Sequence, residues 1–178
     1  MKKLQINSLC VISKFKEHQQ FKNDLLNLIS NAEAKEVYHA NGIDSISRSD
    51  WEIDPSIRRE YVHAFIPIIQ NHMKEVFDFI NQEYKHEHLY NSSIFWFQQY
   101  LKNDSHEWHN HLCPWANVYY LELPKDGPKT LFKDLFGNVV EPDVEEGDVI
   151  TFPGLINHCS PPNKSDKRKT IISFNILR

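Results

Sequence analysis

Three histidines in the second half of the chain have the spacing of ligands that share one metal ion. His109 and His111 stand two residues apart in the run Trp108-His109-Asn110-His111, and His158 follows much further along. Residues i and i+2 of a strand point to the same face, so the first two imidazoles are expected side by side. A close pair with a distant third ligand is typical of a three-ligand site that leaves positions open, as a catalytic metal requires.

The last predicted strand, residues 169–177, carries a cation. Its residues alternate between two faces, with Lys169, Ile171, Ser173 and Asn175 on one and Thr170, Ile172, Phe174 and Ile176 on the other. The second set is nearly all apolar and is expected to pack against helices, which leaves the first set to line a cavity for an acidic ligand. Lys169 is the preferred partner for a carboxylate, because choosing Arg168 would put Ile172 and Phe174 into that cavity.

Other side chains near these segments are candidates for the same cavity. Asn117 and Tyr119 share a face of the strand predicted over residues 115–123, so either could line it. Three tryptophans flank the metal segments, namely Trp96, Trp108 and Trp115. They could wall a substrate pocket, although large aromatic residues in a β core more often serve packing. His106 is interpreted as a neighbour of the site or a surface residue.

Length and composition limit what kind of protein carries this site. The 178 residues correspond to about one domain, expected to span 1–178 with a helical part over 1–90 and a β core over 91–178. Hydrophobic residues are 40% and charged residues 25%, an ordinary globular mixture. A net charge of −4 gives no basic excess, so nucleic acid is not expected as a partner. Only five glycines and no GxxxxGK[ST] or GxGxxG run argue against a phosphate-binding loop.

The cysteines and the apolar segments bear on where the chain works. Cys10, Cys113 and Cys159 are odd in number and widely spread, which fits reduced thiols better than a disulfide framework. No window approaches 18 uncharged apolar residues, and the N-terminal residues lack the apolar core of a signal peptide. We therefore expect a cytoplasmic protein without a membrane partner.

The pattern of apolar residues predicts helices first and strands afterwards. Helical spacing runs over residues 15–32, with Ser13 as N-cap, and over residues 57–84, broken or restarted at Pro67. Strands are predicted at residues 4–12, 36–40, 93–101, 107–111, 115–123, 130–132, 138–140, 148–152 and 169–177, with residues 41–49 as a polar connection. Strands at this spacing are typical of a sandwich, jelly roll or barrel. The predicted fold is α+β, mainly β, with the helices packed on one sheet.

In the order and spacing of its motifs, the C-terminal half resembles the iron(II)- and 2-oxoglutarate-dependent oxygenase superfamily, and within it a group of small bacterial and phage proteins. The matching segments, spread over about half the chain, are His109-Asn110-His111, Val118-Tyr119-Tyr120-Leu121, the run GDVITFP over 147–153, His158, and Ile172-Ser173-Phe174-Asn175. The resemblance implies a double-stranded β-helix core, also called a cupin-like jelly roll, with Fe(II) as metal and 2-oxoglutarate as cosubstrate.

The same resemblance implies roles for particular residues. His109, His111 and His158 would hold the iron, which 2-oxoglutarate chelates. The residues implied for binding the cosubstrate are Lys169, Arg168, Ser173, Asn175, Tyr119 and Asn117. Reaction with O2 would give succinate and CO2 and hydroxylate a C–H bond of a small-molecule or peptidyl substrate.

The sequence departs from the superfamily's pattern at two positions. His111 stands where a carboxylate is usual, and reading the pair as His111 with Cys113 would offer a thiol instead. Lys169 stands where arginine is commoner. Three imidazoles also suit a cupin-type dioxygenase that uses no 2-oxoglutarate, or a jelly-roll module that binds metal without catalysis. Both stay open as alternatives, and the sequence does not reveal the substrate or the oligomeric state.

Overall fold

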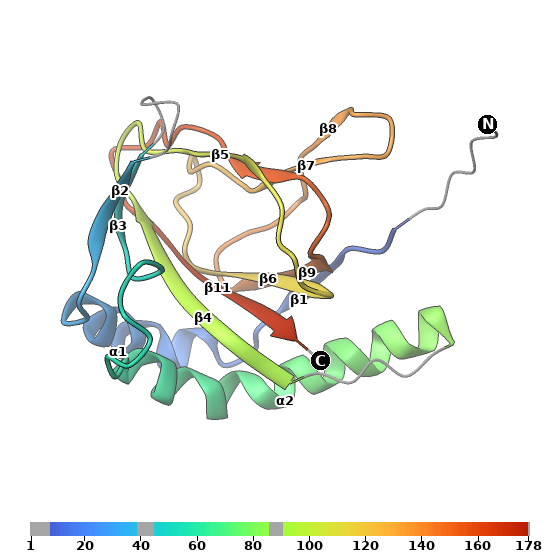
Figure 1. Ribbon diagram of the computed structural model, residues 1–178, viewed down its shortest axis with the longest axis horizontal. Helices are drawn as coiled ribbons and strands as arrows, with labels where there is room; N and C mark the ends of the chain where they lie inside the picture. The colour runs from blue at the N-terminus through green and yellow to red at the C-terminus, as the bar shows by residue number, and fades with distance from the viewer. Residues whose placement is uncertain (1–7, 39–44, 86–90, 178) are drawn as a thin grey trace.

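The computed structural model describes residues 8–38, 45–85 and 91–177 of the chain (Figure 1). Its elements follow one another as β1 (Val11–Lys14), α1 (His18–Ser30), β2 (Lys35–Tyr38), β3 (Ser45–Ser49), α2 (Glu60–Tyr84), β4 (Asn91–Tyr100), β5 (His106–His109), β6 (Trp115–Glu122), β7 (Leu131–Lys133), β8 (Val139–Val140), β9 (Asp148–Pro153), β10 (His158–Ser160) and β11 (Lys169–Leu177). No helix within these ranges is long and apolar enough to cross a membrane.

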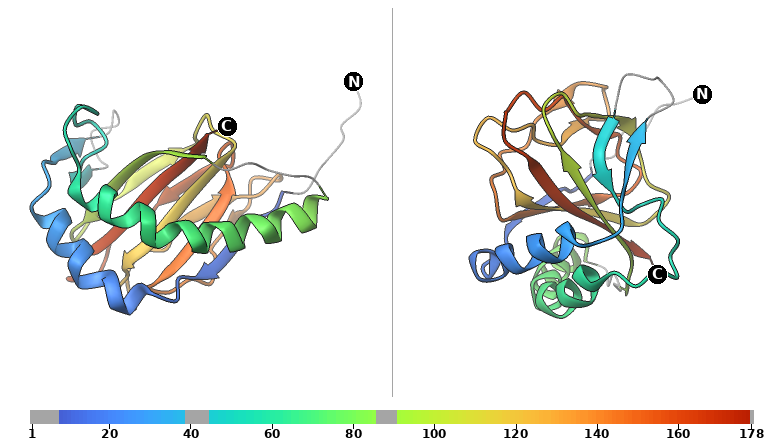
Figure 2. Two further views of the ribbon diagram at one scale, coloured as in Figure 1. Left: turned by 90° about the horizontal axis from the view of Figure 1, so that it is seen from below. Right: turned by 90° about the vertical axis from the view of Figure 1, so that its left-hand side faces the viewer.

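The strands form two antiparallel sheets. The larger has the order β1-β9-β6-β11-β4-β3-β2, and the smaller has the order β5-β10-β7-β8. Figures 1 and 2 show α1 and α2 against one face of the larger sheet, with the smaller sheet beyond its other face. The chain is therefore mainly β with two helices that cover one sheet face, as the sequence predicts.

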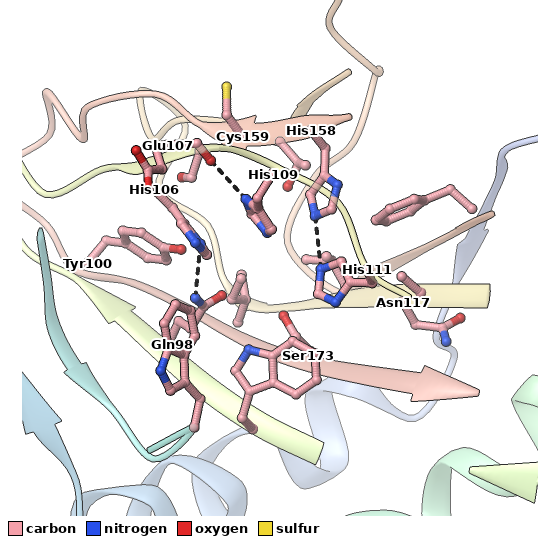
Figure 3. A pocket seen from close by; sticks show the side chains of 18 residues that line it. Gln98, Tyr100, His106, Glu107, His109, His111, Asn117, His158, Cys159 and Ser173 are labelled. Carbon is pink, nitrogen blue, oxygen red and sulfur yellow. Dashed lines mark hydrogen bonds between the residues drawn. The ribbon is translucent and has the colours of Figure 1, made fainter. Parts of the chain in front are cut away.

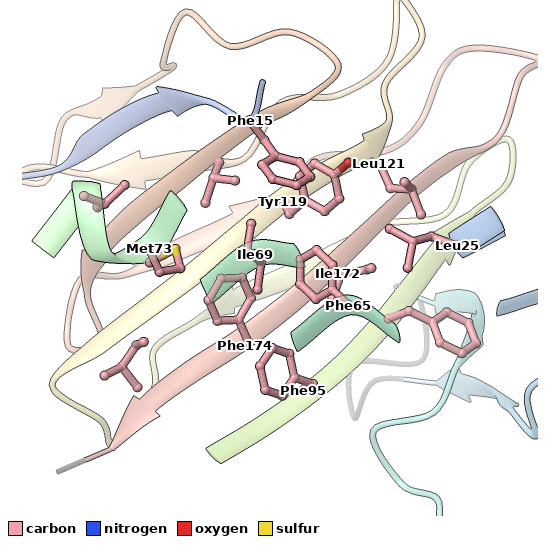
Figure 4. Close-up of a cluster of buried hydrophobic side chains, with 14 of the residues drawn as sticks. Phe15, Leu25, Phe65, Ile69, Met73, Phe95, Tyr119, Leu121, Ile172 and Phe174 are labelled. Atoms are coloured by element: carbon pink, nitrogen blue, oxygen red, sulfur yellow. The ribbon is translucent and has the colours of Figure 1, made fainter. Parts of the chain in front are cut away.

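A hydrophobic core fills the space between the helices and the larger sheet (Figure 4). β11 contributes Ile172, Phe174 and Ile176 to it, so the predicted alternation of this strand is confirmed for these residues. Phe65 of α2 stacks on Tyr119 of β6 with ring centroids 5.4 Å apart. Burying a side chain of this size stabilises the fold by about 1.5–3 kcal/mol, which fixes the faces of β6 and β11 relative to the helices.

Helix α2 runs without a break through Pro67, contrary to the predicted interruption. Proline in a helix interior removes a backbone hydrogen bond and costs about 3 kcal/mol. The apolar stripe on both sides of Pro67 offsets this cost, because Phe65, Ile69 and Met73 are all buried in the same core. Tertiary packing thus overrides the local preference.

Several element boundaries also differ from the predicted ones. α1 begins at His18, so Ser13 is not its N-cap but a residue of β1. The strands β3 and β10 are not predicted, because β3 is polar and β10 has only three residues. With β1, β2 and β3, the N-terminal half supplies strands as well as helices. The strands predicted at 4–12 and 36–40 lie partly outside the described residues.

Candidate metal centre

The three predicted metal ligands converge at one end of the space between the sheets (Figure 3). His109 ends β5 and His158 begins β10, and these two residues are direct partners in the antiparallel pair. His111 lies on the loop after β5. One nitrogen of each ring lies within 4.8 Å of the others, and the Nε2 atoms of His111 and His158 are 3.2 Å apart. Two ligands at right angles on one metal, each about 2.1 Å from it, would be roughly 3 Å apart, so this pair fits a shared cation.

A glycine holds the loop that carries His111. The backbone N–H of His111 donates to the Gly154 carbonyl at 2.7 Å, and the Gly154 N–H donates to the Pro114 carbonyl at 3.2 Å. A Cβ atom at Gly154 would lie only 2.3 Å from the Cys113 carbonyl oxygen, so only glycine allows this close approach. Sequence reasoning missed this residue; the turn Pro153-Gly154 directly after a strand was the available signal.

Backbone carbonyls set the tautomers of two of the histidines. Nδ1 of His109 lies 2.8 Å from the Glu107 carbonyl, and Nδ1 of His158 lies 2.9 Å from the Ile156 carbonyl. A carbonyl oxygen only accepts, so each Nδ1 carries the hydrogen and leaves the Nε2 lone pair for a metal.

Burial keeps the imidazoles of His111 and His158 neutral. Burial, with a smaller contribution from the nearby His109 imidazole, lowers the pKa of His111 to about 4 and that of His158 to about 3. Neutral imidazole is the form that binds a metal. The donor set therefore fits a divalent transition metal such as iron or zinc.

A cavity of about 500 Å³ opens beside the histidines. Its other walls include Ser160 of β10, Tyr100 of β4 and Ser173 of β11. Lys169 lies next to these residues, fully buried, and its Nζ donates to Ser160 Oγ at 2.8 Å and stands 4.8 Å from the centre of the Tyr100 ring. Burial lowers the pKa of Lys169 to about 7. Within the described part of the chain no carboxylate lies in ion-pair reach of this Nζ, an arrangement that is costly without an anionic ligand.

The remaining residues predicted to bind the cosubstrate have different surroundings. Arg168 is exposed and pairs with Glu122 at 2.8 Å, so it points away from the cavity. Asn117 borders the cavity, but its side chain is already hydrogen-bonded to Thr151 Oγ1 and to the Phe174 carbonyl. Asn175 lies further along β11, beyond the cavity lining.

Tyr119 does not line the cavity. It is buried in the core under the helices, where its hydroxyl lies 2.7 Å from Nδ1 of His18. Two of the tryptophans are also elsewhere. Trp115 packs edge-on against Phe77 of α2, and Trp108 is 37% exposed beneath the ammonium group of Lys133. The predicted faces of β6 relative to the cavity were therefore wrong for Tyr119.

Trp96 does line the cavity, and so does His106, which was expected beside the site or at the surface; Gln98 and Trp51 also line it, and sequence reasoning did not place these two there. The Trp96 ring stacks on His111 with centroids 5.6 Å apart. His106 stacks on His109 at 3.9 Å and lies 3.2 Å from Gln98 Nε2 (Figure 3). Trp51 packs on His106 from the segment before α2. The alternation of Trp96, Gln98 and Tyr100 along β4 was a usable signal, whereas nothing in the local sequence marks Trp51.

No model of a known protein family matches the sequence, and no curated protein matches it. Solved structures do match. A prolyl-4-hydroxylase from Pseudomonas putida is 14% identical with a TM-score of 0.65, over 95% of this chain and 92% of that one. An oxidoreductase of the 2OG-Fe(II) oxygenase family from Burkholderia pseudomallei is 11% identical with a TM-score of 0.74, over 94% and 84%. The collagen prolyl hydroxylase of Paramecium Bursaria Chlorella virus-1, in its 2OG complex, is 16% identical with a TM-score of 0.59, over 94% of each chain.

These likenesses define the class of fold. The chain has the fold of 2OG-Fe(II) oxygenases, and its histidine triad could bind a metal ion. The resemblance to this superfamily that the motifs indicate is thereby confirmed at the level of the fold.

Proposed function

We propose that this protein is an Fe(II)- and 2-oxoglutarate-dependent dioxygenase that hydroxylates a C–H bond of an organic substrate, on a double-stranded β-helix core. One observation carries the proposal. Three imidazoles border a cavity, and a buried lysine that has no carboxylate partner among the described residues is hydrogen-bonded to Ser160 of the same cavity. This arrangement suits a dianion that chelates a metal at one end and presents a second carboxylate at the other. The shared fold of 2OG-Fe(II) oxygenases supports it.

The chain's own groups would hold the two partners as follows. His109, His111 and His158 would bind the iron through Nε2, with the Nδ1 hydrogens of His109 and His158 fixed by backbone carbonyls. Lys169 would bind the far carboxylate of 2-oxoglutarate, which would raise its pKa again and keep the proton on Nζ. The Ser173 hydroxyl lines the cavity and is available as a further donor.

Bound iron and 2-oxoglutarate supply an oxidation in which one atom of O2 enters succinate and the other enters the substrate, with loss of CO2. The protein's part is to orient the partners and to keep water out. Trp96, Val118 and Phe152 give the cavity an apolar wall next to the histidines.

One residue favours a second candidate function. His111 supplies an imidazole where a carboxylate would be usual, and a three-histidine site suits a dioxygenase that does not use 2-oxoglutarate. The two candidates make different demands on Lys169. Only the first needs it as the partner of an anionic cosubstrate.

Anaerobic protein with Fe(II) and 2-oxoglutarate, examined for the visible charge-transfer band of the chelate, tests the proposal. Wild type should give the band, and His158→Ala should lose it. Lys169→Ala should need about 10- to 100-fold more 2-oxoglutarate, the usual range for losing a hydrogen bond to a charged group. Arg168→Ala is the matched control, because that cation pairs with Glu122 on the surface.

Each other outcome has a definite meaning. Bound iron without a band at any 2-oxoglutarate concentration would favour the three-histidine dioxygenase. A protein that binds no iron would contradict both candidates. Equal effects of Lys169→Ala and Arg168→Ala would remove the assigned role of Lys169.

A further inference from the structure

A second hollow adjoins the histidine cavity. It has a volume of about 570 Å³ and lies between β4, the start of α2 and the segment that joins β3 to α2. Trp51 and Trp96 line both spaces, so a molecule in one would meet these rings before entering the other. The joining segment is anchored to β4, because the buried Asp50 carboxylate accepts hydrogen bonds from the Phe97 N–H and the Tyr61 hydroxyl. The hollow is therefore a built feature of the fold.

Trp96, which lines both spaces, carries an unsatisfied hydrogen-bond donor. The residue is only 8% exposed, and its indole Nε1 is buried without a hydrogen-bond partner in the described part of the chain. Indole nitrogen is a donor only, and leaving such a group unsatisfied is unfavourable. The ring itself is fixed by stacking on His111. An acceptor oxygen of a bound molecule would satisfy this N–H within reach of the metal ligands.

The lining of the second hollow is apolar and basic. Ile57, Ile66 and Ile94 are partly exposed at it, and its charged or ionisable side chains are Arg58, Arg59 and His63, with no carboxylate among the described lining residues. This composition is complementary to an apolar molecule that carries an acid group.

Of the two arginines, only Arg58 is available to a ligand. Arg59 is held in the fold, because its guanidinium donates to the Phe95 and Ile53 carbonyls. Arg58 is exposed, and within the described residues it pairs only with the exposed Glu60. Pairs of this kind contribute little and exchange readily for another anion.

We propose that this second hollow is the substrate subsite of the histidine centre and takes an apolar carboxylic acid that also bears a carbonyl oxygen, as in an N-acylated apolar amino acid. The carboxylate lies at Arg58, the carbonyl oxygen accepts the Trp96 N–H, and the apolar chain passes Trp51 towards the histidines. As a substrate assignment this rests on the proposed function, but the binding itself does not require iron or 2-oxoglutarate.

Calorimetric titration of metal-free protein with N-octanoyl-leucine, without 2-oxoglutarate, tests the subsite. The acid should bind at one site, and N-octanoyl-leucinamide, which lacks the charge, should bind about tenfold more weakly. Arg58→Gln should abolish the preference for the acid. Trp96→Phe keeps an aromatic ring but removes the N–H together with part of the indole, and it should weaken both compounds about two- to tenfold. The controls are Arg168→Gln and Trp108→Phe, which lie outside both hollows.

Three results would overturn the assignment. Equal binding of the acid and the amide would remove the role of Arg58. If Trp96→Phe and Trp108→Phe lost the same affinity for the two compounds, the indole N–H of Trp96 would have no role in binding. The third result is that the acid binds only when 2-oxoglutarate is present, or that Trp96→Phe weakens the binding of 2-oxoglutarate but not that of the acid. Either finding would place the Trp96 donor in the cosubstrate site instead. Because iron is absent, failure here is distinguishable from failure of the charge-transfer band.

Discussion

Replacing Lys169 by methionine removes a buried charge while keeping a long, unbranched side chain. In the wild type, Nζ is fully buried with a hydroxyl and an aromatic ring as neighbours. Without an anionic ligand the charged form is therefore poorly compensated. The variant should be more stable than the wild type near neutral pH.

The size and pH dependence of this effect follow from the pKa. Burial lowers the pKa of Lys169 from 10.5 to about 7, and each unit corresponds to about 1.4 kcal/mol. Carrying the charge thus costs on the order of 5 kcal/mol at pH values below 7. Between pH 7 and 10.5 the unfolded chain binds this proton and the folded chain does not, so wild-type stability rises with pH in that window. The excess stability of the variant should be about 4 kcal/mol at pH 7 and vanish near pH 10.5.

Urea unfolding of wild type and Lys169→Met at several pH values measures this difference. Arg168→Met is the control, because Arg168 is exposed and its loss should leave the pH dependence unchanged. Adding 2-oxoglutarate at pH 7 should stabilise the wild type and not Lys169→Met. A difference between the two proteins that stays constant from pH 7 to 10 would refute the reasoning, since the lysine would then not titrate in this window.

Two further predictions concern positions where the structure shows close packing. Gly154→Ala should displace the His111 loop, because the new Cβ would meet the Cys113 carbonyl at 2.3 Å, and should therefore weaken Co(II) binding in a spectroscopic titration. Tyr119→Phe removes the buried hydrogen bond to His18, so it should lower the free energy of unfolding by about 1 kcal/mol without changing the affinity for 2-oxoglutarate.

Both of these have direct controls. In Gly137→Ala the added Cβ has no atom within 4 Å, but the residue has a positive φ of 85°. The substitution should therefore cost about 1 kcal/mol of stability and leave the metal affinity unchanged. If Gly137→Ala weakened Co(II) binding as much as Gly154→Ala, the role of the close approach would be wrong. If Tyr119→Phe lost affinity for 2-oxoglutarate, Tyr119 would contact the cosubstrate, contrary to its position in the core.

The class of fold was readable from periodicity. Period-2 alternation and turn residues located most strands of the second half, and the apolar stripe of α2 located the longer helix. The strands β3 and β10 were not predicted, because neither has a hydrophobic pattern of its own. Both exist through pairing with neighbours, β3 with β2 and β4 and β10 with β5 and β7, and pairing across the chain leaves no local signal.

The candidate site was likewise predictable only in part. The ligand types and the choice of Lys169 over Arg168 came from residue chemistry and from the alternation of β11, which the structure bears out in the placement of Ile172 and Phe174. The walls of the cavity could not be assigned. Alternation says that Tyr119 and Tyr120 face opposite ways, but not which of them faces the helices.

By itself the sequence determined which groups could do chemistry: three imidazoles, a cation on the last strand, and strands able to carry them. Tertiary structure alone decided that β5 and β10 pair so that His109 and His158 meet, that Gly154 brings His111 beside them, and that Trp51 joins the wall. The physical reason is that side-chain periodicity is a property of one strand. Convergence of side chains depends on register between strands and on close contacts between distant loops, which no single segment encodes.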